Sequence, residues 1–307
     1  MCSIVGLYDI TTKKQLSEEF FSDSFHFMKS RGPDNQSHIE LDKYCSLGHQ
    51  RLSIIDVGNQ ANQPMTFGQY TIVFNGEIYN YIELKDELKS KNIKFETTSD
   101  TEVLMKGIIL EDLSFLNKVN GMFAFALYNS DSKELILARD RYGVKPLHYM
   151  IQDEVIYFSS EIKPLINIKN NKKINIDVYK NFFEHMATDY NEETFVKDIY
   201  QVKKGHHITI NESFEEKQWY FGNDFIFDES IFEDKDKTLQ FVEDTILSAI
   251  EFRMRADVPI CLTLSGGVDS TTIYTLIKER LNKEIKLFTF IHPNSETNEY
   301  AKVIKLV

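Results

Sequence analysis

The chain has 307 residues, 42% of them hydrophobic and 27% charged, a length and composition that allow two ordinary globular domains. Its formal net charge is -12, and its few basic pairs stand among acidic residues, which argues against a nucleic-acid-binding surface. The sequence has no apolar run of the ~20 residues that span a bilayer and only three cysteines, without CxxC spacing, so we expect a soluble, cytoplasmic protein with reduced thiols.

Residues 1 to about 160 alternate between short β-type runs and helical segments. The β-type runs are rich in β-branched and aromatic residues, and Asn-Ser-Asp-Ser at 129–132 predicts a hairpin between two of them. Apolar residues recur at helical spacing over 16–30, 81–91 and 100–111. The predicted class of this region is therefore α+β, with a core made mainly of sheet.

The rest of the chain has a different pattern. A polar, irregular stretch between about 200 and 235 indicates a last strand and a linker, after which a long helix is predicted. From 258 onward the order is strand, glycine loop, helix, strand, a βαβ unit that requires a parallel sheet. We therefore predict a first domain over 2–220, a linker over 221–235 and a second, α/β domain over 236–307.

The glycine loop SGGVDS, residues 265–270, lies between an apolar strand and a helix. Consecutive backbone N–H groups and a helix N-terminus bind phosphate at such a place, although neither GxxxxGK[ST] nor GxGxxG is matched. The alternative is a turn of small residues in which Asp269 and Ser270 cap the helix. Two glycines flanked by serines exceed what a cap requires, so a nucleotide or pyrophosphate loop is favoured.

Cys2 directly follows the initiator methionine. Once Met1 is removed, Cys2 carries its own base, because an α-amine has a reference pKa of about 7.7 to 8.0 and can take the thiol proton directly or through water. The alternative is a small buried hydrophobe on an edge strand. Position alone leaves both interpretations open.

Further motifs favour the nucleophile. They are RGPDN at 31–35, HQRLSIID at 49–56, FNGEIYN at 74–80 and SDTEVL at 99–104, with GMFAFALYN, ARDRYGVKPLHY and FSSEIKPL downstream. In order and spacing these resemble the class II glutamine amidotransferase domain, an N-terminal nucleophile hydrolase with four layers, αββα, in which two antiparallel sheets lie between helices. SGGVDS resembles the PP-loop of ATP pyrophosphatases. From residue 2 to about 300 the chain is similar to the family of glutamine-hydrolysing asparagine synthetases.

The resemblance implies a glutaminase site with Cys2, Asn75 and Gly76 as its catalytic residues. Asn75-Gly76 is a strong hairpin signal, and the same turn would aim the Asn75 amide and the Gly76 N–H at an oxyanion, each donor being worth about 3 kcal/mol of barrier. Arg51 could be a solvated residue on an edge strand, but a guanidinium binds an α-carboxylate bidentately, and the resemblance assigns Arg51 to that of glutamine.

The same resemblance assigns Glu77 and Asp100 to the α-ammonium of glutamine. Asp100 also has a structural interpretation, because Ser99 and Glu102 form a capping box at the start of its helix, and both roles can hold together. Structural roles are predicted for a tight turn at 31–34, for Cys45 and Cys261 in the core, and for His49.

A second half-reaction is also implied. ATP and Mg2+ would convert the β-carboxyl of aspartate to an acyl-adenylate, and ammonia would reach it through an intramolecular channel to give asparagine, AMP and pyrophosphate. The metal ligands stay unknown, and a homodimer is compatible with the resemblance. The residues expected to bind ATP are Leu264, Ser265, Gly266, Gly267, Asp269 and Ser270.

Two departures from the family pattern concern this second site. The chain ends at Val307, before the SGEGADELFGGY-type motif of the family, so we expect a truncated PP-loop domain, the alternative being a glutaminase without synthetase activity. FTFIHPNSETNEY stands where a FSIGF-like strand and an acidic stretch are usual, which leaves the adenine contacts and the acceptor open. Another carboxylate, for example a sugar acid of a surface polysaccharide, is therefore an alternative to aspartate.

Overall fold

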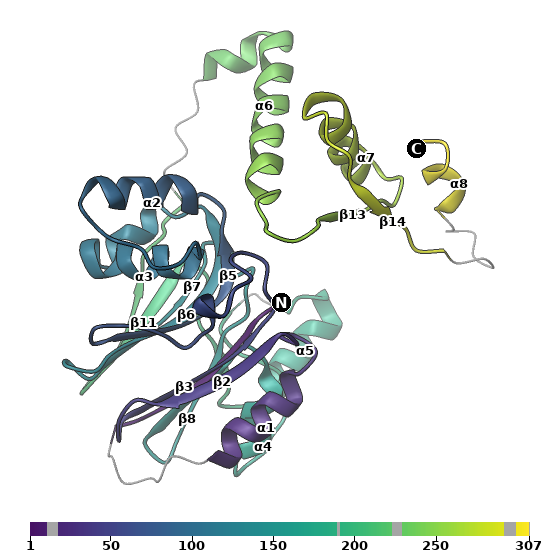
Figure 1. Ribbon diagram of the computed structural model, residues 1–307. Helices are drawn as coiled ribbons and strands as arrows, with labels where there is room; N and C mark the ends of the chain where they lie inside the picture. Colours follow the sequence, from purple (N-terminus) through teal and green to yellow (C-terminus); the bar gives the residue numbers. More distant parts are fainter. Residues whose placement is uncertain (11–17, 189–190, 223–228, 292–298, 307) are drawn as a thin grey trace. The chain divides into compact units, whose positions relative to one another are not determined.

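In a computed structural model the chain divides into two compact units, Met1–Gly222 and Asn223–Val307 (Figure 1). The described residues are 1–10, 18–188, 191–222, 229–291 and 299–306. The predicted linker lies partly outside them, and a 3-10 helix, η3 (Glu229–Glu233), forms part of the rest. The segment at 292–298, which is the HPNSETN part of the FTFIHPNSETNEY departure, lies outside the described residues. Among the described helices, none is long and apolar enough to cross a membrane.

Two six-stranded antiparallel sheets form the centre of the first unit. The first sheet has the order β10-β8-β9-β1-β3-β2, with β1 Ser3–Asp9, β2 Asn35–Glu40, β3 Cys45–Arg51, β8 His148–Gln152, β9 Val155–Ser159 and β10 Tyr200–Gln201. The second has the order β12-β11-β7-β6-β5-β4, with β4 Met65–Phe67, β5 Tyr70–Ile78, β6 Gly121–Asn129, β7 Glu134–Arg139, β11 His206–Ile210 and β12 Phe214–Gln218. Pairing of Asn129 with Glu134 confirms the hairpin predicted between β6 and β7.

Helices cover the outer face of each sheet. The first sheet packs against α1 (Glu18–Met28) and α4 (Ile162–Ile168), and the second against α2 (Tyr81–Ser90) and α3 (Asp100–Glu111). One buried cluster fills each of these two spaces, and a third, which includes Ile4 and Val73, lies between the sheets. Three apolar clusters between helices and sheets mean four layers, so the predicted αββα domain is confirmed. Burial of apolar surface in these three interfaces holds the layers together.

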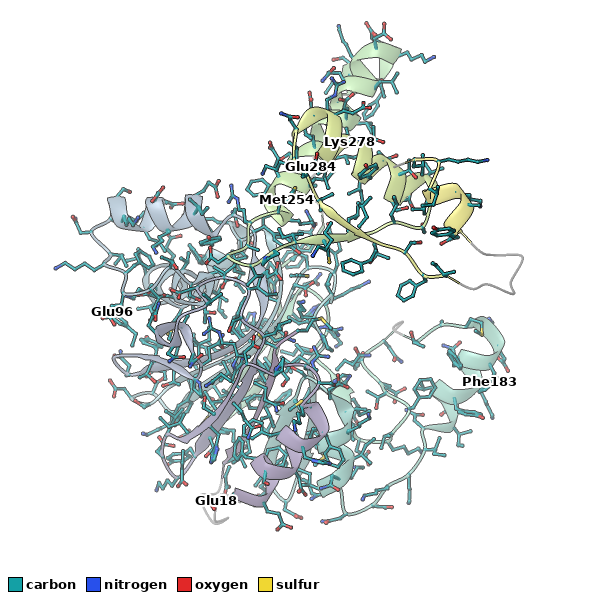
Figure 2. All side chains as sticks on the ribbon, turned by 45° about the vertical axis from the view of Figure 1, so that its right-hand side comes forward. Glu18, Glu96, Phe183, Met254, Lys278 and Glu284 are labelled. Atoms are coloured by element: carbon teal, nitrogen blue, oxygen red, sulfur yellow. The ribbon has the colours of Figure 1, made fainter. Side chains whose placement is uncertain are left out.

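Three further elements complete the first unit. They are the 3-10 helices η1 (Asn59–Ala61) and η2 (Asp112–Asn117) and helix α5 (Ile176–His185). Only Val178 of α5 is buried, and Phe183, labelled in Figure 2, is 62% exposed.

The predicted hairpin turn at Asn75-Gly76 is wrong. Both residues lie inside β5, where Asn75 pairs with Ala124 and Gly76 with Phe123 of β6. The glycine serves close packing instead of a turn, because a Cβ on residue 76 would stand 2.3 Å from the carbonyl oxygen of Met122.

The predicted capping box on α3 is half right. Ser99 is the N-cap, and its hydroxyl accepts a hydrogen bond from the backbone N–H of Thr101. Glu102 does not reach back to Ser99, since its carboxylate binds the Lys106 ammonium at 2.6 Å and backbone N–H groups of the preceding loop, among them that of Thr97 at 2.8 Å. The buried Lys106 ammonium is a stronger hydrogen-bond partner for this carboxylate than the backbone N–H of Ser99.

The second unit contains a parallel pair of strands, β13 (Cys261–Thr263) and β14 (Lys286–Phe288), which confirms the βαβ order. Its other elements are α6 (Lys235–Arg253), α7 (Val268–Thr275), the π-helical turn η4 (Leu276–Arg280) and α8 (Tyr300–Val303). The core position predicted for Cys261 is wrong, because the strand alternates and Cys261 is exposed while Leu264 is buried. Cys45 is fully buried, as predicted.

Candidate active site

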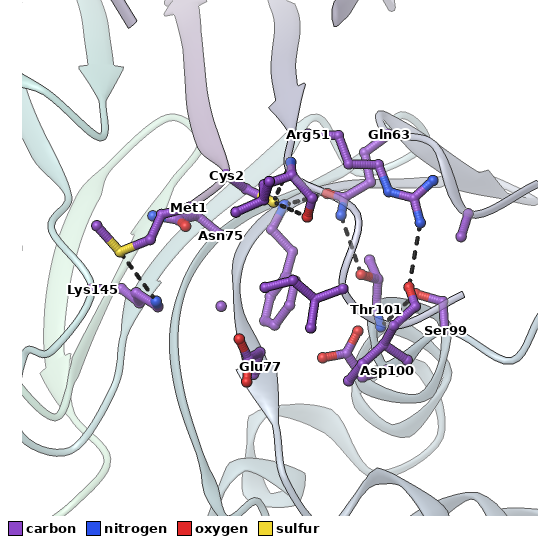
Figure 3. A pocket seen from close by; sticks show the side chains of 16 residues that line it. Met1, Cys2, Arg51, Gln63, Asn75, Glu77, Ser99, Asp100, Thr101 and Lys145 are labelled. Carbon is purple, nitrogen blue, oxygen red and sulfur yellow. Dashed lines mark hydrogen bonds between the residues drawn. The ribbon is translucent and has the colours of Figure 1, made fainter. Parts of the chain in front are cut away.

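A pocket at the start of β1 brings together all the residues predicted for the glutaminase site (Figure 3). Its walls include Met1, Gln63 and Lys145, and the predicted residues are Cys2, Arg51, Asn75, Gly76, Glu77 and Asp100. The free volume is about 40 Å³ with Met1 at the rim, which holds little more than a water or two. Removal of Met1 enlarges this space.

Cys2 precedes β1 and is held from two sides. Its Sγ lies 3.5 Å from the carbonyl oxygen of Leu52 and 3.4 Å from the N–H of the same residue, and the Arg31 Nε donates to the Cys2 carbonyl at 3.1 Å. Burial raises the pKa of the Cys2 thiol. The thiol therefore keeps its proton near neutral pH and needs a base to become a nucleophile.

The α-amine of the chain belongs to Met1, the residue before Cys2. Burial lowers the pKa of this amine, because the charged form loses solvation. The base expected for the thiol is a different group, the amine of Cys2, which is freed only when Met1 is removed.

Asn75 is the most unusual polar residue of the pocket. Its side chain is 1% exposed, and neither its Nδ2 nor its Oδ1 has a hydrogen-bond partner within the described chain. A buried amide without partners costs about 1–3 kcal/mol, so a ligand that pairs with it recovers a substantial free energy. Figure 3 shows Asn75 close to Cys2.

The strand around Asn75 is fixed by side chains along its open edge. The N–H of Phe74 donates to the Gln63 Oε1 at 2.6 Å, and its carbonyl lies 3.1 Å from the His49 Nε2. The N–H of Ile78 donates to the Asp100 Oδ2 at 3.0 Å. Antiparallel alternation puts the Gly76 N–H on this same edge, between the two, so it faces the pocket instead of β6. Burial lowers the pKa of His49 to about 3, so the ring is neutral, in agreement with a structural role.

Two carboxylates form the floor of the pocket. Asp100 is buried, and burial raises its pKa to about 6, while burial also raises the pKa of Glu77. Neither has a Lys, Arg or His nitrogen within 4.0 Å in the part of the chain that the structure describes. A buried acid, Asp100, and a half-buried one, Glu77, without a cation at contact distance are a site for one, and an α-ammonium has the required charge.

Arg51 is 4% exposed, and its terminal nitrogens are already engaged. Nη1 donates to the Gly58 carbonyl at 2.8 Å and to the Asn62 Oδ1 at 2.7 Å, while Nη2 donates to the Asp56 and Ile55 carbonyls. A carboxylate would bind Arg51 only by replacing some of these neutral oxygens, an exchange that favours the charged acceptor.

Three residues of the site were not predicted. Arg31 was assigned only to a turn, whereas it also holds the Cys2 carbonyl and pairs with Glu161 at 2.7 Å. Gln63 joins β5 to α3 through the Thr101 hydroxyl at 3.2 Å, and Lys145 enters from the ARDRYGVKPLHY motif. Neither the type of these three residues nor their local spacing indicates a place in the site, because each contacts residues that are distant in sequence.

In the second unit the predicted ATP-binding residues form a closed loop. The Ser265 and Ser270 hydroxyls lie 3.0 Å apart, and Gly266 has a φ of +73°, which a side chain would strain. Helix α7 starts at Val268 with Gly267 as its N-cap, so Asp269 and Ser270 lie in its first turn and are not caps. Leu264 is fully buried, so it can offer a ligand only its backbone.

Comparison with known proteins agrees with this arrangement. Residues 1–221 match the family described as glutamine amidotransferase domain, and residues 242–305 match asparagine synthase. Asparagine synthetase [glutamine-hydrolyzing] 1 of Bacillus subtilis is 34% identical over 94% of this chain and 45% of its own length. Amidase chyE of Penicillium rubens is 31% identical over 86% of this chain and 39% of its own. The chain thus spans less than half the length of these two curated relatives.

A solved structure shares the fold. Glutamine phosphoribosylpyrophosphate amidotransferase from B. subtilis superposes with a TM-score of 0.51 at 16% identity, over 97% of this chain and 68% of that one. At that identity the likeness concerns the fold alone. The match over residues 1–221 covers most of the chain, and the chain therefore belongs to the class II glutamine amidotransferase family, with a segment of an asparagine synthase domain after it.

Proposed function

We propose that the first unit hydrolyses glutamine at Cys2 and that the whole protein passes the ammonia to an ATP-activated carboxylate. The observation that carries this proposal is the buried Asn75 amide, which lacks hydrogen-bond partners in the same pocket as the Cys2 thiol. An amide kept unpaired beside a nucleophile suits an oxyanion that exists only during the reaction.

The chemistry begins with removal of Met1. The freed α-amine of Cys2 takes the thiol proton, and the thiolate attacks the side-chain carbonyl carbon of glutamine. The oxyanion receives hydrogen bonds from the Asn75 Nδ2 and the Gly76 N–H. Its collapse, with the proton returned to the leaving nitrogen, gives ammonia and a γ-glutamyl thioester, which water hydrolyses to glutamate.

The substrate's α-groups fit the charges of the pocket. Glu77 and Asp100 would bind the α-ammonium, which supplies the cation that these two acids lack at contact distance. Arg51 would bind the α-carboxylate by exchanging loop carbonyls for it. Free glutamine, with both α-groups charged, is therefore a better substrate than a glutaminyl side chain within a peptide.

The proposed acceptor is aspartate, converted to asparagine with release of AMP and pyrophosphate. In this proposal Leu264, Ser265, Gly266, Gly267, Asp269 and Ser270 bind ATP. Among the described residues there is no group of three or more His, Cys, Asp or Glu that could hold a metal ion, so Mg2+ would arrive on the ATP phosphates. The amidase name of a relative supports a second candidate, transfer of ammonia to a different carboxylate.

The test is release of glutamate from glutamine by wild-type protein and by Cys2→Ala. We expect release by the wild type, with intact mass showing loss of Met1, and none by the variant. AMP formed with aspartate would support asparagine synthesis, and consumption of another carboxylate would support the second candidate. Formation of ADP would contradict the pyrophosphatase loop, and release of glutamate by Cys2→Ala would contradict the nucleophile.

A further inference from the structure

The edge of β5 beside the pocket loses its neighbouring strand just before the proposed oxyanion residues. Strand β4 begins at Met65, which lies opposite Ile72 of β5. In the same register Phe74 would pair with the backbone of Gln63, but the Gln63 carbonyl accepts the Ser37 hydroxyl instead. The Gln63 side chain takes over, since its Oε1 accepts the N–H of Phe74 at 2.6 Å.

The same side-chain amide also binds helix α3. Its Nε2 donates to the Thr101 Oγ1 at 3.2 Å (Figure 3). Gln63 is 5% exposed and Thr101 2%, so bulk water has little access to this bond. The N–H of Thr101 is held in turn by the N-cap hydroxyl of Ser99 at 3.1 Å. One buried amide therefore joins the residue before Asn75 to the residue after Asp100.

Another hydrogen bond joins β5 to α3 further along the strand. There the Asp100 Oδ2 accepts the N–H of Ile78 at 3.0 Å. One directional bond fixes a single point, and the apolar contacts that pack α3 on β5 have no direction of their own. The Gln63 bridge at Phe74 adds a second fixed point. The two points enclose residues 75–77, so they set both the distance and the orientation of α3 relative to that part of β5.

The proposed substrate extends across this enclosed part of the site. Its side-chain carbonyl would lie at Asn75 and Gly76 of β5, and its α-ammonium at Glu77 and at Asp100 of α3. Asparagine carries the same groups on a side chain that is one methylene shorter. Over a fixed spacing it cannot occupy both ends at once, and a misplacement of about 1 Å can cost about 10²-fold in rate.

We propose that Gln63 is a positioning residue that fixes the spacing between the oxyanion donors on β5 and the ammonium-binding carboxylate on α3, and thereby selects glutamine over asparagine. This inference rests on the proposed glutamine hydrolysis. Gln63 acts through Asn75 and Asp100, and its amide neither gives nor takes a proton in the reaction. Without the bridge both ends of the site remain but their spacing varies, so the shorter substrate gains relative to glutamine.

The experiment measures kcat and KM for hydrolysis of glutamine and of asparagine without ATP, on protein shown by intact mass to lack Met1. The wild type should prefer glutamine by at least about 100-fold in kcat/KM. Gln63→Met removes both bonds of the amide at similar length and should reduce kcat for glutamine and the preference by about tenfold or more each. Thr101→Val loses only the bond to α3 and should reduce the preference in the same direction.

Two further variants separate positioning from a general structural role. Thr101→Ser keeps the hydroxyl and should restore the preference that Thr101→Val loses. Gln152→Met is the matched control, because the Gln152 amide also joins two segments, donating to the Ile168 carbonyl at 3.2 Å and accepting the Asn170 N–H at 2.9 Å. It belongs to β8 in the other sheet and does not line the pocket, so its loss should lower stability and leave the preference unchanged.

The two levels of the hypothesis fail in different ways. If Gln63→Met does not fold, Thr101→Val against Thr101→Ser decides. An unchanged preference, including no measurable asparagine hydrolysis in any folded variant, or an equal reduction in Gln152→Met, overturns the role of Gln63 and leaves glutamine hydrolysis intact. A processed wild type that does not hydrolyse glutamine overturns both.

Discussion

Gly76 of β5 lies against the backbone of Met122 so closely that a Cβ on residue 76 would stand 2.3 Å from the Met122 carbonyl oxygen. The same glycine follows Asn75 and turns its own N–H toward the pocket. Packing of β5 on β6 and the proposed oxyanion site therefore depend on one missing side chain.

Gly76→Ala should lower both stability and activity, because the clash is with backbone and the strands must separate. We expect a loss of about 1–3 kcal/mol in the free energy of unfolding and at least a tenfold loss of kcat for glutamine hydrolysis. The control Gly68→Ala has nothing within 4 Å and a φ of +58°, so it should cost about 1 kcal/mol of strain and leave kcat unchanged. Equal kcat in the two variants would argue against this dependence.

Asn75→Ala should abolish most catalysis without loss of stability. Its amide has no partner in the free protein, so its removal breaks no hydrogen bond, while the oxyanion loses a donor and kcat falls by about 10²–10³-fold. Asn80→Ala is the opposite case. Its amide bonds the Lys118 carbonyl at 2.9 Å and the Asn120 N–H at 2.8 Å, so this variant should unfold more easily and keep its kcat. Thermal unfolding and steady-state kinetics distinguish the two, and an Asn75→Ala variant with normal kcat would refute the oxyanion role.

Asp100→Asn should stabilise the free protein while weakening glutamine binding. The pKa of Asp100 is about 6 when folded, above its unfolded value, so its contribution to stability is full below about pH 4 and is lost as pH rises through about 6. At pH 7 the ionised Asp100 carboxylate lowers the free energy of unfolding by an amount on the order of 1–3 kcal/mol, and the neutral amide of the variant removes this penalty. KM for glutamine should rise at least tenfold in the same variant.

Denaturant unfolding at pH 7 and pH 4 checks this expectation, with Asp86→Asn as the control. Asp86 has a side chain that is 67% exposed, so its replacement should change neither stability nor KM appreciably. Lower stability of Asp100→Asn than of the wild type at pH 7 would show that burial of the ionised Asp100 carboxylate does not destabilise the folded protein.

Lys106→Met should destabilise the first unit strongly. Lys106 Nζ and the Glu102 Oε1 lie 2.6 Å apart with both side chains 4% exposed, and loss of the cation leaves a buried carboxylate unpaired, at a cost of about 3–5 kcal/mol. Lys91 is 40% exposed and pairs with Glu87 and Glu111. Lys91→Met breaks these exposed pairs and should lower the free energy of unfolding by less than about 1 kcal/mol. Urea denaturation measures both, and similar costs for the two variants would contradict the effect of burial.

The layers were predictable because they depend on local patterns, and the residues that meet in the pocket were predicted from the resemblance of their motifs to a known family. Alternating apolar residues identified the strands, helical spacing identified α2 and α3, and Cys2 with its neighbouring motifs indicated the chemistry. Contacts between distant segments were not predictable. Asn75-Gly76 has the sequence of a hairpin turn, yet Met122 on another strand sets its conformation.

Lys145 shows the same limit for the site. In the sequence it is one lysine in a loop, and only the folding of that loop around Asp140 directs it toward Cys2. Glu102 likewise suits a capping box, but Lys106, one helical turn further on, takes its carboxylate. The local rule fails for Glu102 because a buried charge selects its strongest available partner.

The most direct test of Cys2 as the nucleophile is mass spectrometry of the N-terminal peptide after acid quench of the protein turning over glutamine. The account predicts a peptide that begins at Cys2, without Met1, and carries a γ-glutamyl group on the Cys2 sulfur. Turnover by protein that retains Met1, or a glutamyl group on any other residue, would contradict it.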